Sequence, residues 1–300
     1  MYFDSDIMRL TPALLKSARP RQWVKNVVVF AALLFSRNAF NPPLLLRSLA
    51  AFVAFCAVSG AVYIFNDLAD LRHDRHHPLK CRRPIAAGEL PPAAAAVGSA
   101  LLLLVGLGVG FVVSEAFCVA TIMYVLLQIL YSLLFKNVII LDVFALSAGF
   151  VLRVVAGALA IDVAISSWLL VCTILLALFL ALSKRRHELS LLGVEASDHR
   201  KVLEEYSIYL LDQMISVVTA STVVAYALYT MSEVTQRKFG TPYLVFTIPF
   251  VIYGIFRYLY LVHRKKGGGS PEVTLLTDMP LLFDIVAWAA VAGAIVYTTN

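Results

Sequence analysis

Apolar runs of about 20 residues, the length of helix that crosses the hydrocarbon core of a bilayer, follow one another along the whole chain. The breaks between them are charged or rich in Pro and Gly, such as SRNAFNPP, where two prolines stop one helix and start the next, and the shorter VSEA. The pattern predicts nine spans, near residues 23–41, 44–66, 92–113, 116–135, 138–160, 166–183, 207–231, 242–262 and 280–298. We therefore expect an all-α polytopic membrane protein with one membrane domain over residues 1–300.

Composition agrees with this pattern. Of the 300 residues, 60% are hydrophobic and only 15% are charged, which is more apolar surface than a soluble domain can bury. Residues 1–22 carry several charges and no long apolar core, so we expect no cleavable signal peptide and a first span that acts as the insertion signal. The four cysteines form no CxxC motif, so neither a disulfide framework nor a zinc site is indicated.

The distribution of Lys and Arg predicts the orientation. Of the 25 such residues, 19 fall on one side of the predicted arrangement, 4 on the other and 2 inside spans. Because cytoplasmic segments carry the excess of cations, the segment 1–22 and the loops 67–91, 184–206 and 263–279 are expected in the cytoplasm and the C-terminus outside. The net charge of +6 thus reflects topology, and nucleic-acid binding is not needed to explain it. The KKGGGSPE stretch is expected to be a flexible loop within the domain.

A dense mixture of charges, NDLADLRHDRHHPLKCRR, follows the second predicted span. Asn66, Asp67, Asp70 and Asp74 fit the pattern N-D-x-x-D-x-x-x-D. On a helix, Asn66, Asp70 and Asp74 form a column of oxygen ligands with roughly 6 Å of rise between neighbours. Such a sparse set suits Mg²⁺ that completes its shell with substrate phosphates. The alternative is a solvated helix end whose acids pair with its own arginines, but the column begins in apolar sequence, which favours the metal site.

Cations follow this acidic column directly. Lys80 offers a compact charge, and Arg82 and Arg83 offer planar forks, for phosphate oxygens. The positive-inside bias accounts for cations in a cytoplasmic loop, but not for their place beside the acids. The three histidines, His73, His76 and His77, are interpreted as solvated loop residues.

Other polar residues are predicted at the cytoplasmic ends of spans. Lys25 could extend its chain to the interface or face a cavity, and the sequence leaves both open. Tyr63 shares the helical face of Asn66, so its side chain could touch a substrate beside the metal. Lys136 follows the fourth span.

Two further cationic features need partners. Arg153 lies among apolar residues inside the fifth span, and a buried arginine requires an anion, either Asp142 or Asp162 or a substrate phosphate. The sixth span ends in LALSKRRHEL, which forms a second cationic cluster with only one acid near it in sequence. The members of this second cluster are Lys184, Arg185, Arg186, His187 and Glu188.

Taken together, nine spans, the NDxxDxxxD motif and a second charged loop after the sixth span resemble the UbiA superfamily of membrane prenyltransferases over essentially the whole chain. Most members carry a second Asp-rich motif for a second Mg²⁺ in that later loop, where this chain reads SKRRHELSLLG. The stretches RPRQWVKN, NDLADLRHDRHHPLKCRRPIAAG, ALSKRRHEL and GGGSPEVTLLTD are similar to one branch, the decaprenyl-phosphate phosphoribosyltransferases.

That resemblance implies transfer of 5-phosphoribose from 5-phosphoribosyl-1-diphosphate (PRPP) to a polyprenyl phosphate, with Mg²⁺ at Asn66 and Asp70, assisted by Asp67 or Asp74. Three anionic groups would need more cations than one prenyl diphosphate does, which agrees with a second cluster of Lys and Arg. Arg186 has no clear role in this scheme. The residues expected at substrate phosphates are Lys25, Tyr63, Lys80, Arg82, Arg83, Lys136, Arg153, Lys184 and Arg185.

Two other functions are carried as alternatives: prenyl transfer to an aromatic or other acceptor, and a transporter or lipid-binding protein, which charges gathered at one face disfavour. The expected cell location is the plasma (inner) membrane, with the active site facing the cytoplasm. The sequence leaves the oligomeric state open, with a homo-oligomer among the alternatives.

Overall fold

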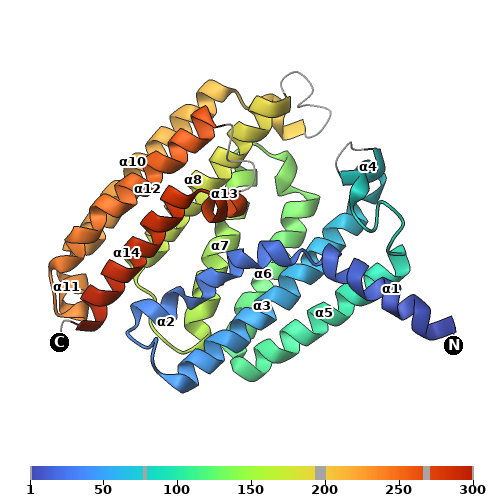
Figure 1. Cartoon of the computed structure of the whole chain (residues 1–300), viewed down its shortest axis with the longest axis horizontal. Coiled ribbons are helices and arrows are strands. Elements are labelled where there is room, and N and C mark those ends of the chain that lie inside the picture. Colours follow the sequence, from blue (N-terminus) through green and yellow to red (C-terminus); the bar gives the residue numbers. More distant parts are fainter. Residues whose placement is uncertain (1, 77–79, 193–200, 266–270, 299–300) are drawn as a thin grey trace. The chain divides into compact units, whose positions relative to one another are not determined.

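The computed structural model describes residues 2–76, 80–192, 201–265 and 271–298, and these residues form helices and turns without any strand (Figure 1). His77 and the centre of the KKGGGSPE stretch lie outside them. Within the described part of the chain, eight helical segments are long and apolar enough to cross a membrane. They are α3 (Pro42–Ala69), α5 (Pro92–Val113), α6 (Glu115–Leu133), α7 (Leu141–Ala160), α8 (Ser167–Leu192), α10 (Ile208–Met231), η6 (Tyr243–Thr247) with α12 (Ile248–Arg264), and α14 (Met279–Thr298).

The first predicted span takes a different form. Pro20–Phe30 make a 3-10 helix, η1, which Ala31–Phe35 continue as the short helix α2. Three consecutive valines in η1 disfavour an α-helix because β-branched side chains crowd the preceding turn. At about 2.0 Å of rise per residue for η1 and 1.5 Å for α2, the two together measure roughly 30 Å, close to the thickness of the hydrocarbon core.

The break at VSEA is confirmed, because α5 ends at Val113 and α6 begins at Glu115. The Ser114 hydroxyl accepts a hydrogen bond from the Phe117 amide and donates one to the Leu159 carbonyl. Ser114 therefore caps α6 and ties its start to the end of α7. Shorter elements connect the long helices: α1 (Tyr2–Ser17), α4 (Leu71–His76), η2 (Lys80–Arg82), η3 (Phe135–Asn137), η5 (Lys201–Glu205), α11 (Glu233–Phe239) and α13 (Pro271–Thr277).

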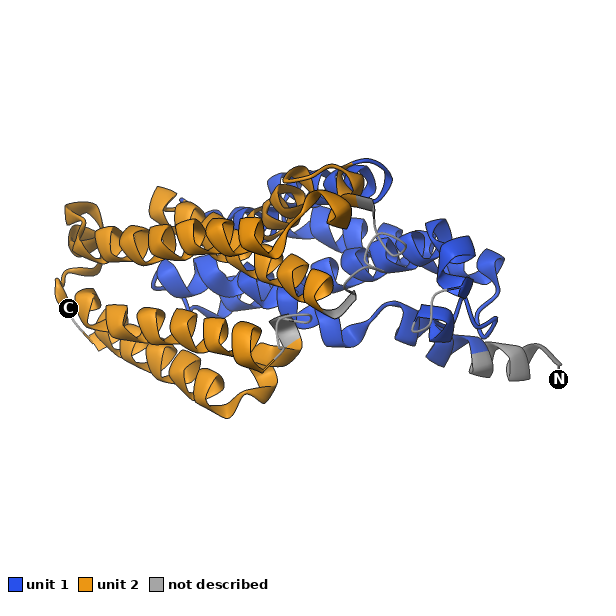
Figure 2. Ribbon diagram, turned by 90° about the horizontal axis from the view of Figure 1, so that it is seen from above, with its two compact units in different colours: residues 1–134, 152–164 blue, residues 135–151, 165–300 orange. Residues whose placement is uncertain are grey.

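The chain divides into two compact units (Figure 2). Unit 1 comprises residues 1–134 and 152–164, and unit 2 comprises residues 135–151 and 165–300, so α7 contributes to both. In unit 1, α3 packs along α5 and η1. In unit 2, α8 packs along α10, around a core that includes Leu178, Leu182 and Leu211. The single membrane domain expected from the sequence stays a prediction.

Candidate active site

The acidic motif lies where α3 ends in unit 1. Asn66 and Asp67 are in its last turn, Asp70 caps it, and Asp74 belongs to α4. The expected single helix is thus interrupted at Asp70, where the backbone leaves the helical conformation. Backbone hydrogen bonds nevertheless join Asp70 N to Asn66 O and Asp74 N to Asp70 O, each at 2.9 Å. The spacing of one turn between the three residues is therefore kept.

Two of the acids are buried and paired with arginines. Asp67 and Asp74 are each 2% exposed. Arg83 Nη1 lies 3.0 Å from Asp67 Oδ1 and 2.5 Å from Asp74 Oδ2, so one guanidinium bridges both acids and holds its loop against α3. Arg19 forms a second ion pair with Asp67, and its guanidinium lies 5.2 Å from the centre of the Tyr63 ring. Pairing with arginine, the alternative weighed for the whole motif, is what the structure shows for these two acids. Sequence reasoning gave Arg19 no such role.

Asn66 and Asp70 differ from the paired acids. The Asn66 Oδ1 atom is buried and has no hydrogen-bond partner among the described residues. Leaving a buried acceptor unpaired is unfavourable, so this oxygen is suited to a ligand. The Asp70 carboxylate is half-buried one turn further along. In the described residues no three His, Cys, Asp or Glu side chains form a metal cage. An amide oxygen and a carboxylate are sufficient protein ligands for a Mg²⁺ that takes its other ligands from substrate phosphates and water.

Three further cations of unit 1, Lys25, Lys80 and Arg82, lie nearer the surface. Lys25 and Lys80 are half-buried, and Arg82 is exposed. The Lys25 ammonium donates a hydrogen bond to Gln22 Oε1 over 2.7 Å, within its own 3-10 helix. The structure thus leaves Lys25, Lys80 and Arg82 accessible to a solute.

Arg153 is 4% exposed and meets neutral side chains in unit 1. Its Nε atom donates to Asn26 Oδ1 and its Nη2 atom to the Tyr124 hydroxyl, both over 2.8 Å. The Asn26 amide nitrogen in turn donates to the Ser59 hydroxyl at 3.1 Å. Asn26 and Tyr124 were missed by sequence reasoning. A signal existed for Asn26, because it is a polar residue within the apolar run VKNVVVF and such residues need a partner.

The second cationic cluster lies on a helix, not in a loop, because α8 continues through Lys184–Glu188 to Leu192. Arg185 and Asp142 are both 0% exposed. Arg185 Nε lies 2.5 Å from Asp142 Oδ2, and Nη1 lies 2.5 Å from Glu188 Oε2. Asp142, considered above as a partner of Arg153, is thus a partner of Arg185.

The same carboxylate has a third neighbour. The Tyr206 hydroxyl donates a hydrogen bond to Asp142 Oδ1 over 2.8 Å. Burial, and then this bond to the carboxylate, raise the pKa of Tyr206, so the phenol keeps its proton. Lys136 and Lys184, in contrast, are half-buried. Unit 2 therefore combines a buried arginine paired with two carboxylates and two half-buried lysines.

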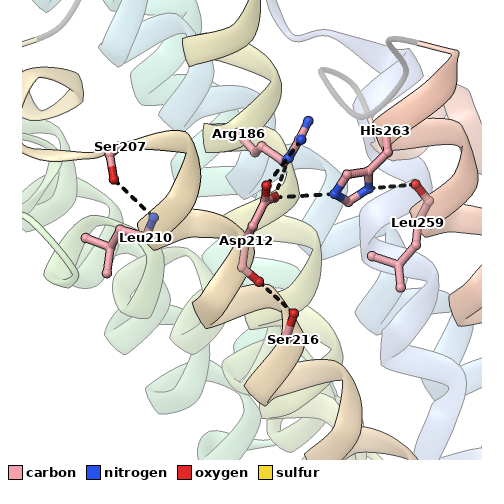
Figure 3. A network of polar contacts seen from close by, with 7 residues as sticks. All are labelled: Arg186, Ser207, Leu210, Asp212, Ser216, Leu259 and His263. Atoms are coloured by element: carbon pink, nitrogen blue, oxygen red, sulfur yellow. Dashed lines mark hydrogen bonds and ion pairs between the residues drawn. The ribbon is translucent and has the colours of Figure 1, made fainter.

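Arg186 has a structural partner in unit 2 (Figure 3). Its Nε atom lies 2.5 Å from Asp212 Oδ1, and His263 Nε2 approaches the same oxygen at 3.3 Å. The other ring nitrogen of His263 lies 2.9 Å from the Leu259 carbonyl oxygen. This network joins α8, α10 and α12. Glu188 is the acid near the second cluster in sequence, and the fold adds Asp142 and Asp212 from distant parts of the chain.

The decaprenyl-phosphate phosphoribosyltransferase of Corynebacterium glutamicum is 34% identical over 285 residues, which cover 93% of this chain and 85% of that protein. The protein of the same name from Mycolicibacterium smegmatis is 33% identical over 301 residues, covering 96% and 93%.

Among solved structures, a UbiA homologue from Archaeoglobus fulgidus bound to GPP and Mg²⁺ superimposes with a TM-score of 0.71 at 18% identity. The match covers 95% of this chain and 99% of that one, so the expected all-α UbiA fold is confirmed. Residues 26–276 match the UbiA prenyltransferase family. The chain is a multi-pass membrane protein that belongs to the UbiA prenyltransferase family.

Proposed function

We propose that this protein transfers 5-phosphoribose from PRPP to a polyprenyl phosphate and releases diphosphate. The observation that carries the proposal is the likeness, at 33–34% identity over more than nine tenths of the chain, to two proteins named decaprenyl-phosphate phosphoribosyltransferase. The site agrees with the proposal, because each unit carries two half-buried lysines, Lys25 and Lys80 in unit 1 and Lys136 and Lys184 in unit 2, and lysine is a suitable ligand for phosphate oxygens.

Asn66 Oδ1 and Asp70 would hold Mg²⁺ in this scheme. The bound cation would neutralise charge on the diphosphate of PRPP. Asp67 and Asp74 are committed to Arg19 and Arg83, so in our proposal they support the metal ligands by fixing the end of α3.

The chain's own cations would orient the substrates. Lys25, Lys80 and Arg82 in unit 1 are suited to the phosphates of PRPP, and Tyr63 lies on the face of α3 that leads to Asn66. Lys136 and Lys184 in unit 2 are suited to phosphate oxygens as well, Lys136 to those of the lipid.

The buried arginines would act differently. A direct phosphate contact of Arg185, expected from the sequence, would require its guanidinium to leave two carboxylates, so we assign Arg185 to positioning Lys184. Arg83 likewise positions Lys80 by bridging Asp67 and Asp74. Arg153 remains a candidate phosphate ligand whose orientation Asn26 and Tyr124 would set.

The reaction itself needs no strong base. An oxygen of the lipid phosphate is already anionic and would form the new bond to C1 of the ribose, while the bond from C1 to the diphosphate oxygen breaks. Positive charge that develops on the sugar and negative charge on the leaving group are stabilised by fixed charges of the protein, which is the main source of rate enhancement in such sites.

Purified protein in detergent, supplied with labelled PRPP, decaprenyl phosphate and Mg²⁺, should form a phosphoribosyl lipid. We expect Asp70→Ala to abolish product and EDTA to do the same reversibly, whereas Arg237→Ala, an exposed cation in α11, should leave the rate unchanged. Transfer from a prenyl diphosphate to an aromatic acceptor, with no use of PRPP, would instead establish the prenyltransferase alternative.

We also propose that the active face is cytoplasmic in a plasma (inner) membrane. Cys81, in η2, is half-buried and lies outside the candidate spans. A membrane-impermeant maleimide should label Cys81 only after intact cells are opened, and a Cys81→Ser variant controls for the other thiols. Labelling of Cys81 from outside intact cells would reverse the orientation. The oligomeric state stays open.

A further inference from the structure

The turn between η3 and α7 contains a strained residue in unit 2. Ile140 has φ of +68°, in the left-handed region that a β-branched side chain rarely adopts. Its side chain is 42% exposed, so burial of the isoleucine does not account for this conformation. Strained backbone of this kind persists only where the surroundings hold it, and it concentrates at functional sites. The turn lies between Lys136 and Asp142, two residues that the site already includes.

A hydroxyl group from a distant part of the chain supports this turn, in addition to the backbone bonds that the Val143 and Phe144 amides donate to the Ile140 carbonyl oxygen. The Ile140 amide donates a hydrogen bond to the Tyr206 hydroxyl oxygen over 2.9 Å. The same hydroxyl donates its proton to Asp142 Oδ1 over 2.8 Å. Tyr206 is 4% exposed and directly follows η5. It lies 66 residues further along the chain than Ile140. The Tyr206 hydroxyl uses its own proton in the bond to Asp142, and the Ile140 amide supplies the proton of the second bond. Both bonds can therefore form at the same time.

The second carboxylate oxygen of Asp142, Oδ2, binds Arg185, which is adjacent in sequence to Lys184. Tyr206, Asp142 and Arg185 thus form one buried chain of contacts from the turn beside Lys136 to the end of α8. Burial raises the pKa of Tyr206, so its hydroxyl keeps the proton that it donates to Asp142.

We propose that Tyr206 is a positioning residue, which holds the strained turn at Ile140 and thereby fixes where Lys136 presents its ammonium group to a phosphate of the lipid substrate. The inference rests on the proposed function for the identity of that phosphate. Without the hydroxyl, the Ile140 amide loses the bond that offsets part of its strain, so the turn relaxes toward negative φ and Lys136 moves with it. Tyr206 contacts no substrate itself.

The test compares two hydroxyl deletions in unit 2. Tyr206→Phe removes both bonds at the turn, and Tyr226→Phe removes a similar pair, to Thr247 and from Trp288, away from the site. We expect Tyr206→Phe to raise KM for decaprenyl phosphate about tenfold with kcat within about twofold, and Tyr226→Phe to change neither. Equal kinetics of the two variants would overturn the proposal.

A rescue variant separates positioning from general damage. Glycine adopts positive φ without strain, so Ile140→Gly in the Tyr206→Phe background should recover at least half of the lost affinity, although it restores no hydrogen bond. Independent, additive effects of the two substitutions would contradict a coupling through the turn.

Failure of the proposed function would look different. If the unmodified protein forms no phosphoribosyl lipid, the proposed reaction is wrong, but hydrogen exchange of the Ile140 amide still reports on the turn. We expect that amide to exchange at least tenfold faster in Tyr206→Phe than in Tyr226→Phe. Equal exchange rates would show that the hydroxyl does not hold the turn.

Discussion

Truncation of Arg185 should affect mainly the stability of the protein, whereas truncation of its neighbour Lys184 should affect mainly substrate binding. Arg185 is fully buried between Asp142 and Glu188, whereas Lys184 is half-buried. Arg185→Ala leaves the Asp142 carboxylate buried with a hydrogen bond from Tyr206 but without its cation. We therefore expect a loss of stability from Arg185→Ala, and a loss of substrate affinity from Lys184→Ala.

The magnitude follows from the burial of the pair. Breaking a buried ion pair by removing one partner raises the free energy of the folded state by about 3–5 kcal/mol, because the other charge stays desolvated. At roughly 2 °C per kcal/mol for a chain of this size, the Tm of Arg185→Ala should fall by about 6–10 °C. Lys184 is only half-buried, so the Tm of Lys184→Ala should stay within about 2 °C.

A double variant identifies the cause of the effect. Arg185→Met combined with Asp142→Asn removes both charges and keeps an amide oxygen as acceptor for Tyr206. We expect it to be more stable than Arg185→Ala, since no buried carboxylate is left without a cation.

Stability is measured by thermal unfolding in detergent, monitored as the fraction of protein that remains monodisperse. Substrate binding is measured by the KM values for PRPP and decaprenyl phosphate. If Arg185→Ala kept its Tm and raised KM as expected for Lys184→Ala, the guanidinium would bind substrate and a structural role of Arg185 would be refuted.

Two further predictions concern packing and pH. Gly157→Ala should destabilise the protein by about 1–3 kcal/mol, because the added Cβ would lie 2.1 Å from the Val29 carbonyl oxygen. Gly108→Ala, where nothing lies within 4 Å of the added Cβ, should leave the Tm unchanged or slightly raised. Hydrogen bonds from Arg257 lower the pKa of Asp278, so this link stabilises the fold above about pH 4 and is lost as the pH falls through the lowered pKa. The Tm difference between the unmodified protein and Asp278→Asn should therefore be constant from about pH 7 to 5 and shrink below about pH 4, and a difference that grows in acid would contradict the pairing.

The spanning helices could be predicted because the requirement is local: a helix in lipid needs about 20 apolar residues and satisfies its own backbone. The exception is residues 23–41, where most of the predicted α-helix is the 3-10 helix η1. A count of apolar residues does not distinguish a 3-10 helix from an α-helix. The break at Ser114 was predictable for the same local reason, since a serine before Glu115 is a cap signal.

The pairing of charges could not be predicted, because it depends on residues far apart in the chain. Arg185 meets Asp142 across 43 residues, and Arg153 meets Asn26 across 127. In the sequence alone, the positive-inside bias explains every arginine of the predicted cytoplasmic segments equally well. Only the fold shows that Arg19, Arg83, Arg185 and Arg186 are bound to carboxylates.

The two units use arginine and lysine for different tasks. In unit 1, Arg83 bridges two carboxylates close to Lys80, and in unit 2 Arg185 bridges two carboxylates next to Lys184. A guanidinium suits the bridging task because its planar fork presents several donors in fixed directions, whereas an ammonium on a flexible stem suits a substrate that arrives and leaves. Replacement of either bridging arginine by lysine would keep the charge but lose this fixed geometry. In our proposal, the cations that suggested phosphate chemistry therefore have two roles: Arg83 and Arg185 build the site through their carboxylates, whereas the lysines, together with Arg82 and Arg153, would bind substrate.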